Sequence, residues 1–117
     1  MAKLDGKNVL VVEDDYLIAI GISQSFEEAG ADVIGPVGRV DKALALIAQC
    51  GRIDGAVLDI NLNDEMVFPV AEALCERGVP FLFSTGYDAS IIPERFHDVP
   101  RFLKPVLPGT VREALFS

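Results

Sequence analysis

The chain has 117 residues, half of them hydrophobic and 24% charged, which suits one globular domain with a buried core and excludes a disordered chain. Ten lysines and arginines stand against eighteen aspartates and glutamates, giving a net charge of -8. Such a field repels nucleic acid and anionic membrane surfaces, so we expect neither as a partner.

The sequence carries no sign of export or of a disulfide scaffold. Residues 1–7 lack the apolar core of a signal peptide, and no apolar run is long enough to cross a bilayer. We therefore expect a cytoplasmic protein. Cys50 and Cys75 both fall in apolar helical patterns, where a reduced cysteine usually serves as a small buried hydrophobic residue.

The first part of the chain alternates predicted strands and helices. A short β-branched run at 8–12 is typical of a strand buried on both faces. It leads into the acidic residues 13–15, and apolar residues near helical spacing then predict a helix over 16–29. A second strand is predicted at 32–35 and a second helix at 40–50.

The same unit repeats toward the C-terminus. Residues 55–60 predict a third strand, which is followed by a third helix that stops near Gly78. Residues 81–84 predict a fourth strand, and 102–103 predict a short fifth strand. A closing helix is predicted from about residue 108.

This alternation predicts a doubly wound α/β fold for a single domain over residues 1–117. We expect a five-stranded parallel sheet in the flavodoxin-like order 2-1-3-4-5, with helices on both faces and right-handed crossovers. Pro93 and Pro100 interrupt the stretch where a fourth crossover helix belongs. We therefore expect that helix to be short or mobile.

Polar residues stand where the predicted strands end. The first strand leads into Glu13 and Asp14, and later strands end in Asp59, Thr85 and Lys104. In open α/β sheets the ligand site lies beyond the carboxyl ends of the strands. The fold would therefore gather three carboxylates, a hydroxyl and an ammonium at one edge of the sheet.

This set of side chains suits a metal ion and a phosphoryl group. Crowded carboxylates repel each other, and a hard cation with oxygen ligands relieves the repulsion, so the sequence predicts a Mg²⁺ site. The metal would neutralise a transferring phosphoryl group while Lys104 and the Thr85 hydroxyl contact its other oxygens. Asp59 is then the natural nucleophile, forming an aspartyl phosphate.

In their order along the chain these residues resemble the receiver domains of response regulators in two-component signalling, over essentially the whole sequence. The resemblance lies in Val11-Val12-Glu13-Asp14, Val57-Leu58-Asp59-Ile60-Asn61, Thr85-Gly86 and Lys104-Pro105. It implies that Glu13 acts on the metal mainly through a water, and that the peptide bond before Pro105 is cis.

The resemblance also implies roles for the other site residues. Asp14 and Asp59 would ligate Mg²⁺, and Asn61 would add its backbone carbonyl. Thr85 and Lys104 would hold the phosphoryl group. The phosphoryl donor would be a histidine kinase or a phosphotransfer protein.

Some positions depart from the commonest receiver pattern. The family often has an aromatic switch residue three positions before the lysine, where this chain has Arg101 with Phe102 beside it. Residues 83–87 resemble a receiver subgroup with a Phe-Ala-Thr-Gly-Tyr-like run, in which that switch is missing and the fourth helix is poorly formed. We expect Tyr87 to be a partly buried loop aromatic. Residues 63–66 replace a common Pro and Gly-containing turn, so a different loop shape is expected.

Each signal has a plainer explanation when it is taken alone. Asp14 or Asp15 would suit the cap of the helix that follows, Thr85-Gly86 an ordinary turn, and Lys104-Pro105 the end of a strand. Only their joint arrangement favours the functional interpretation. His97 has no nearby metal-ligand partner in the sequence, and we expect it to be solvated without a chemical role.

The leading hypothesis is a phosphorylation-dependent signalling switch that accepts a phosphoryl group on Asp59 and acts by contact with an unidentified downstream protein. It would assist its own phosphorylation and dephosphorylation and would not be a turnover enzyme. A phosphatase of the haloacid dehalogenase type is disfavoured, because it would need an aspartate where Asn61 stands. A phosphorylation-independent binding module with a receiver fold stays open.

Overall fold

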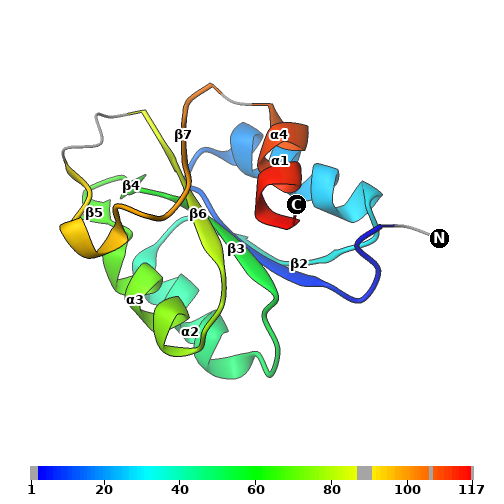
Figure 1. Cartoon of the computed structure of the whole chain (residues 1–117), viewed down its shortest axis with the longest axis horizontal. Coiled ribbons are helices and arrows are strands. Elements are labelled where there is room, and N and C mark those ends of the chain that lie inside the picture. The colour runs from blue at the N-terminus through cyan, green and yellow to red at the C-terminus, as the bar shows by residue number, and fades with distance from the viewer. Residues whose placement is uncertain (1–2, 87–90, 106, 117) are drawn as a thin grey trace.

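The computed structural model describes residues 3–86, 91–105 and 107–116. Within them one five-stranded parallel sheet has the order β2-β1-β3-β6-β7, which confirms the predicted flavodoxin-like order (Figure 1). Its strands are β1 (Asn8–Val12), β2 (Asp32–Val37), β3 (Gly55–Asp59), β6 (Phe81–Thr85) and β7 (Arg101–Leu103). The α-helices are α1 (Tyr16–Glu28), α2 (Val40–Gln49), α3 (Phe68–Glu76) and α4 (Pro108–Phe116). In this part of the chain no helix has both the length and the apolar character to cross a bilayer.

Helices cover both faces of the sheet. Helices α1 and α4 pack together on one face, and α2 and α3 pack together on the other (Figure 1). Because successive side chains of a strand point to opposite faces, β1 serves two cores. Val9 and Val11 join the core under α1 and α4, while Leu10 and Val12 join the core under α2 and α3. All four are fully buried, which explains why the strand is apolar throughout.

The predicted elements lie where expected, with small differences at their ends. The largest concerns β2, which was expected to end at residue 35 but continues to Val37. Gly35 has a φ of 92°, the Gly35–Pro36 peptide is cis, and the pairing of β1 with β2 is irregular here. An edge strand tolerates proline because one row of its backbone groups needs no partner, and β2 lies at the sheet edge.

Pro93 and Pro100 predicted that the helix between β6 and β7 would be short or mobile. The described residues of this connection contain the short 3-10 helix η2 (Glu94–Phe96), preceded by Pro93, and no α-helix. Tyr87 lies outside the described residues, so the expectation for its side chain stays a prediction.

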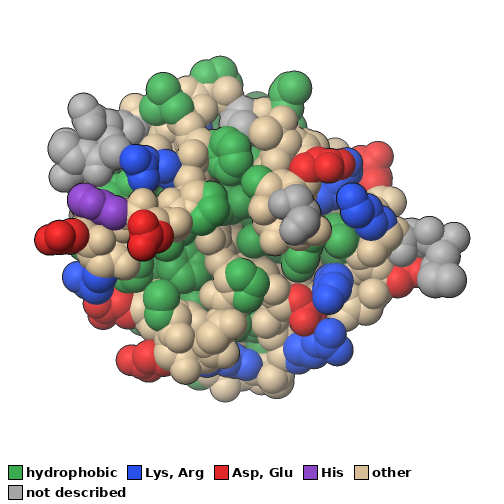
Figure 2. Space-filling view, viewed as in Figure 1, with side chains coloured by type: hydrophobic (Ala, Val, Ile, Leu, Met, Phe, Trp, Pro, Cys, Tyr) green, Lys and Arg blue, Asp and Glu red, His purple; other side chains and the backbone are tan. Residues whose placement is uncertain are grey.

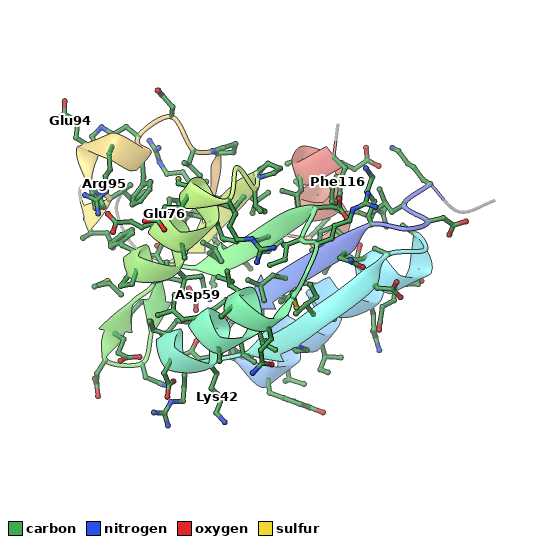
Figure 3. All side chains as sticks on the ribbon, turned by 90° about the horizontal axis from the view of Figure 1, so that it is seen from below. Lys42, Asp59, Glu76, Glu94, Arg95 and Phe116 are labelled. Carbon is green, nitrogen blue, oxygen red and sulfur yellow. The ribbon has the colours of Figure 1, made fainter. Side chains whose placement is uncertain are left out.

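One aromatic side chain holds this connection in place. Phe96 is 2% exposed and contacts three other rings at centroid distances of about 6 Å. Those rings are Phe68 of α3 and Phe81 and Phe83 of β6. Arg95, labelled in Figure 3, lies over the ring of Phe96 and forms an ion pair with Glu72 of α3. Both this ion pair and the ring contact of Phe96 with Phe68 join η2 to α3.

Several large hydrophobic side chains are exposed near the carboxyl ends of the strands. Leu17 in the first turn of α1 is 80% exposed, and Tyr16 beside it is 74% exposed. Leu103 at the end of β7 and Leu107 before α4 are 67% and 75% exposed. Figure 2 shows hydrophobic side chains along the upper edge of the molecule, over the loop between β7 and α4.

The prediction of buried cysteines is wrong for Cys75. Both cysteines are free, but Cys75 is exposed and Cys50, at the end of α2, is only half-buried. The buried face of α3 is formed by Val70, Ala71 and Leu74. Cys75 follows Leu74 directly, and one helical step of about 100° turns it away from that face.

Candidate functional site

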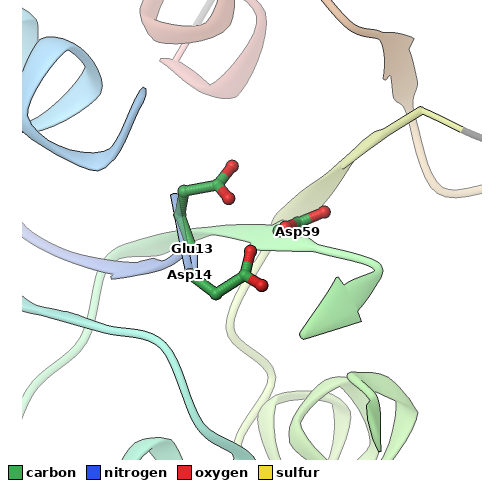
Figure 4. A group of neighbouring side chains, drawn as sticks. All are labelled: Glu13, Asp14 and Asp59. Atoms are coloured by element: carbon green, nitrogen blue, oxygen red, sulfur yellow. The ribbon is translucent and has the colours of Figure 1, made fainter. Parts of the chain in front are cut away.

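The polar residues that end the strands meet at one edge of the sheet. Glu13 and Asp14 directly follow β1, and Asp59 ends the neighbouring strand β3. Carboxylate oxygens of the three residues all lie within 4.8 Å of one another (Figure 4). Thr85 ends β6 and Lys104 follows β7, so the parallel sheet brings both to the same edge.

Lys104 joins two of the carboxylates. Its Nζ lies 2.9 Å from Glu13 Oε1 and 3.2 Å from Asp59 Oδ2. The other oxygen of Glu13 accepts a hydrogen bond from the backbone N–H of Asp15 at 3.0 Å. The side chains of Glu13 and Asp59 are only 1% and 5% exposed, so water screens these ion pairs weakly.

The crowding changes the acidity of the site. Burial raises the pKa of Asp59 to about 8, with further contributions from the Glu13 and Asp14 carboxylates and against the opposing charge of Lys104. Burial alone would lower the pKa of Lys104, but its bonds to Glu13 and Asp59 outweigh burial and raise it. One ammonium therefore does not balance three carboxylates, and the site favours a proton or a cation.

The structure separates the roles of Asp14 and Asp15. Asp15 is the N-cap of α1, and its Oδ1 accepts a hydrogen bond from the backbone N–H of Ile18 at 3.2 Å. Asp14 instead belongs to the carboxylate cluster with Glu13 and Asp59. Burial would raise the pKa of Asp14, but hydrogen bonds with Asp59, Glu13 and the backbone N–H of Asn63 lower it below its ordinary value.

An open pocket lies over the acidic cluster. It is lined by Asp14, Asp15, Asp59, Asn61, Asn63, Gly86 and Lys104. Asn63 was not among the predicted site residues. Its signal is the polar and apolar alternation of residues 59–63, because Ile60 and Leu62 are buried while the residues on either side of each line the pocket.

The structure also places the residues around Thr85 and Lys104 for which the sequence made predictions. Thr85 is 3% exposed, and its backbone carbonyl accepts the N–H of Lys104 at 2.7 Å. The Lys104–Pro105 peptide is cis, as predicted. Arg101, at the position of the usual aromatic switch, is exposed and lies 3.4 Å from the carbonyl of His97, which is also exposed. Phe102 beside it packs against the core under α1 and α4.

Gly38 lets the end of β2 approach this acidic segment. A Cβ at this position would lie 3.0 Å from the Cα of Asp14 and 3.4 Å from the carbonyl of Glu13. Any larger residue would therefore push against the backbone that carries both carboxylates. Glu13 is further held by its backbone N–H, which donates to the carbonyl of Val37 at 2.9 Å.

No protein-family model matches the chain, but solved structures do. SdrG from Sphingomonas melonis Fr1 is 39% identical with a TM-score of 0.79, and the match covers 92% of each chain. A receiver domain protein of CheY type from Methanospirillum hungatei JF-1 is 26% identical with a TM-score of 0.79, covering 92% of this chain and 89% of that one. The chain belongs to the response-regulator receiver family.

Two further relatives bear on this receiver domain. A BeF3-activated form of SdrG from Pseudomonas melonis Fr1 is also 39% identical, with a TM-score of 0.74 and coverage of 92% and 91%. The transcriptional regulatory protein PdtaR of Mycobacterium tuberculosis is 22% identical over 110 residues. These make up 93% of the receiver domain but 53% of PdtaR, so the chain spans about half the length of the curated relatives it matches. Receiver domains are signalling domains and not turnover enzymes.

The likeness to the subgroup with a Phe-Ala-Thr-Gly-Tyr-like run stays a prediction for this receiver domain. Its tyrosine position is Tyr87, which the structure does not describe. In the described part of the β6–β7 connection the short η2 is compatible with the poorly formed fourth helix expected of that subgroup.

Proposed function

We propose that this receiver domain is a phosphorylation-dependent switch that accepts a phosphoryl group on Asp59 from a histidine kinase or a phosphotransfer protein. The observation that carries the proposal is a buried aspartate beside two further carboxylates and one lysine, at the base of an open pocket. The 39% identity to SdrG, for which a BeF3-activated form has been solved, supports it.

The carboxylate cluster fits a divalent cation, and we propose Mg²⁺. The raised pKa of Asp59 reflects burial among like charges, and a cation would replace the proton and leave Asp59 ionised. Asp14 and Asp59 would hold the cation directly, with the backbone carbonyl of Asn61, and Glu13 would act through a water. When bound, the cation neutralises charge on the phosphoryl oxygens.

Each of the remaining site residues has a part in the transfer. A carboxylate oxygen of Asp59 forms a bond to phosphorus while the bond from phosphorus to the donor histidine nitrogen breaks. Lys104, now paired with Asp59 and Glu13, would pair with a phosphoryl oxygen instead. The Thr85 hydroxyl would donate to another oxygen, and the resulting shift of its loop would change the surface that a downstream protein contacts.

The exposed hydrophobic residues next to the pocket are suited to receive the phosphoryl donor. Tyr16 and Leu17 begin α1 directly after the acidic residues, and Leu107 precedes α4. Helices α1 and α4 are in contact. They approach closely at Gly21 of α1, where an added Cβ would lie 3.6 Å from Cγ of Pro108 in α4. An apolar surface of this kind beside a reactive group is typical of a protein interface.

Leu17→Asp is expected to slow phosphoryl transfer from the cognate kinase by about tenfold or more, because it places a charge in an apolar interface. Labelling by acetyl phosphate, which needs no protein contact, should stay within about twofold of wild type. Ala45→Asp, at an exposed position of α2 on the other face of the sheet, is the matched control. Equal slowing with both donors would contradict the assignment of this surface.

The proposed function is tested by intact mass spectrometry after incubation with acetyl phosphate, with Mg²⁺ or with EDTA. A single phosphoryl adduct is expected only with Mg²⁺. Borohydride reduction followed by peptide mapping should place it on Asp59. If neither acetyl phosphate nor a set of phosphorylated kinases produces an adduct, the phosphorylation-independent binding module becomes the better account.

A further inference from the structure

A small hairpin next to the sheet makes direct contact with the acidic cluster. Strands β4 (Asn61–Leu62) and β5 (Glu65–Met66) pair antiparallel immediately after β3, and Asn63 and Asp64 form the turn between them. The backbone N–H of Asn63 donates a hydrogen bond to Asp14 Oδ2 at 3.0 Å. The bond joins two positions 49 residues apart in the chain.

The base of this hairpin is held firmly, so the turn has a defined place over the site. Ile60, Leu62 and Val67 are 0%, 1% and 0% exposed. The N–H of Val67 donates to the carbonyl of Ile60 at 2.9 Å and closes the hairpin. The N–H of Ile60 donates to the carbonyl of Ser84 at 3.0 Å and ties the hairpin to β6.

The residue type at position 63 suits the turn. Asn63 has a φ of 58°, and it is the only residue other than glycine with a positive φ in the described part of the chain. The favoured two-residue turns between antiparallel strands need a positive φ at their first residue, and asparagine adopts it more readily than most residues. Proline can neither adopt this φ nor donate a backbone hydrogen bond.

We propose that the β4–β5 hairpin is a positioning element for the cation site, in which the Asn63 N–H holds Oδ2 of Asp14 and would leave the other oxygen of Asp14 available to a cation. Asn63 acts through Asp14 and contacts no reacting atom. The inference rests on the cation site of the proposed function but does not require phosphoryl transfer. The proposal assigns a structural role to residues 63–66, which depart from the common receiver turn.

The Mg²⁺ dissociation constant of the purified domain, measured by titration calorimetry, tests this inference. Asn63→Gly keeps both the N–H and the positive φ, so its affinity should stay within about twofold of wild type. Asn63→Pro removes both, and its affinity should fall by about three- to tenfold, as for the loss of a solvent-exposed hydrogen bond to a carboxylate. Met66→Ala, an exposed hairpin position, controls for general loosening and should stay within about twofold.

A double-mutant cycle separates positioning from a general effect on the fold. In an Asp14→Ala background, Asn63→Pro should change Mg²⁺ affinity by less than about twofold, because the residue it acts through is gone. An equal loss in both backgrounds, or no loss in the wild-type background, would overturn the inference.

A second measurement covers the case in which Asn63→Pro does not fold. Hydrogen exchange of the Asn63 amide should be faster in Asp14→Ala than in wild type by about threefold or more, because its acceptor is removed. An unchanged exchange rate would count against the inference. A wild-type domain that binds no Mg²⁺ would overturn it, whereas Mg²⁺ binding without any phosphoryl adduct would overturn only the proposed function.

Discussion

Asp59→Asn is expected to take up no phosphoryl group and to make the metal-free domain more stable than wild type at pH 8. The amide is nearly isosteric with the carboxyl group but is a poor nucleophile, so acetyl phosphate with Mg²⁺ should leave its mass unchanged. It also removes one of three carboxylates that lie within 4.8 Å of one another. The gain in stability should therefore grow as the wild-type carboxyl group ionises.

The pH dependence of this effect follows from the raised pKa of Asp59. Burial and the neighbouring carboxylates raise it from 3.8 to about 8, so between these values the folded state holds a proton that the unfolded state has lost. The stabilisation is fully present below pH 3.8 and is lost as pH rises through about 8. The free energy of unfolding of wild type should fall across this window, by at most about 1.4 kcal/mol per pH unit.

Urea unfolding in EDTA at pH 5, 6.5 and 8 measures this difference. Between pH 5 and pH 8 the free energy of unfolding of wild type should fall by about 2–4 kcal/mol relative to that of Asp59→Asn. Asp64→Asn, at an exposed position of the hairpin turn, should follow wild type. Added Mg²⁺ should raise the free energy of unfolding of wild type at pH 8, because the cation binds the folded state. Parallel pH curves for wild type and Asp59→Asn would show that the cluster does not hold a proton.

Phe96→Ala is expected to lower the free energy of unfolding by about 3–5 kcal/mol, as for other large buried aromatic residues. Phe96 is 2% exposed and contacts the rings of Phe68, Phe81 and Phe83. In the described part of the β6–β7 connection, which contains no α-helix, Phe96 and Ile92 are the two buried hydrophobic side chains, and both belong to the core under α2 and α3. The cavity left by alanine would open into that cluster.

Urea unfolding at constant pH, compared with two control variants, tests this role. Phe96→Leu keeps most of the side-chain volume and should cost less than about 2 kcal/mol. Ile91→Ala changes a residue of the same connection that is 36% exposed, and should cost about 1 kcal/mol or less. If Phe96→Ala cost no more than Ile91→Ala, the connection would be held by other contacts, such as the ion pair of Arg95 with Glu72.

Much of the fold and the site could be predicted because it depends on local patterns and on one general property of parallel sheets. Continuous apolar runs such as residues 8–12 identify strands buried on both faces, and their alternation with helices predicts a parallel sheet, for which the flavodoxin-like order is a common arrangement. Strands that run parallel end at the same edge, which is why Asp14, Asp59, Thr85 and Lys104 could be grouped before their positions were known. Their chemical roles remain predictions.

Other features depend on contacts between segments far apart in the chain, which no local pattern contains. Either Asp14 or Asp15 suits an N-cap, and only the pairing of β1 with β3 in the folded sheet places Asp14 in the cluster with Asp59 and leaves the N-cap to Asp15. The hydrogen bond from Asn63 to Asp14 likewise needs the folded hairpin.

The sequence by itself determined which residue types reach the edge of the sheet. Hydrophobic periodicity sets where strands and helices form, and the carboxyl ends of parallel strands then meet at one edge. Only the tertiary structure decided how those groups affect each other. The pKa of Asp59 depends on burial and on distances of a few ångströms to Glu13, Asp14 and Lys104, which follow β1 and β7. Electrostatic energies vary steeply with distance and burial, so they are properties of the packed molecule and not of the chain.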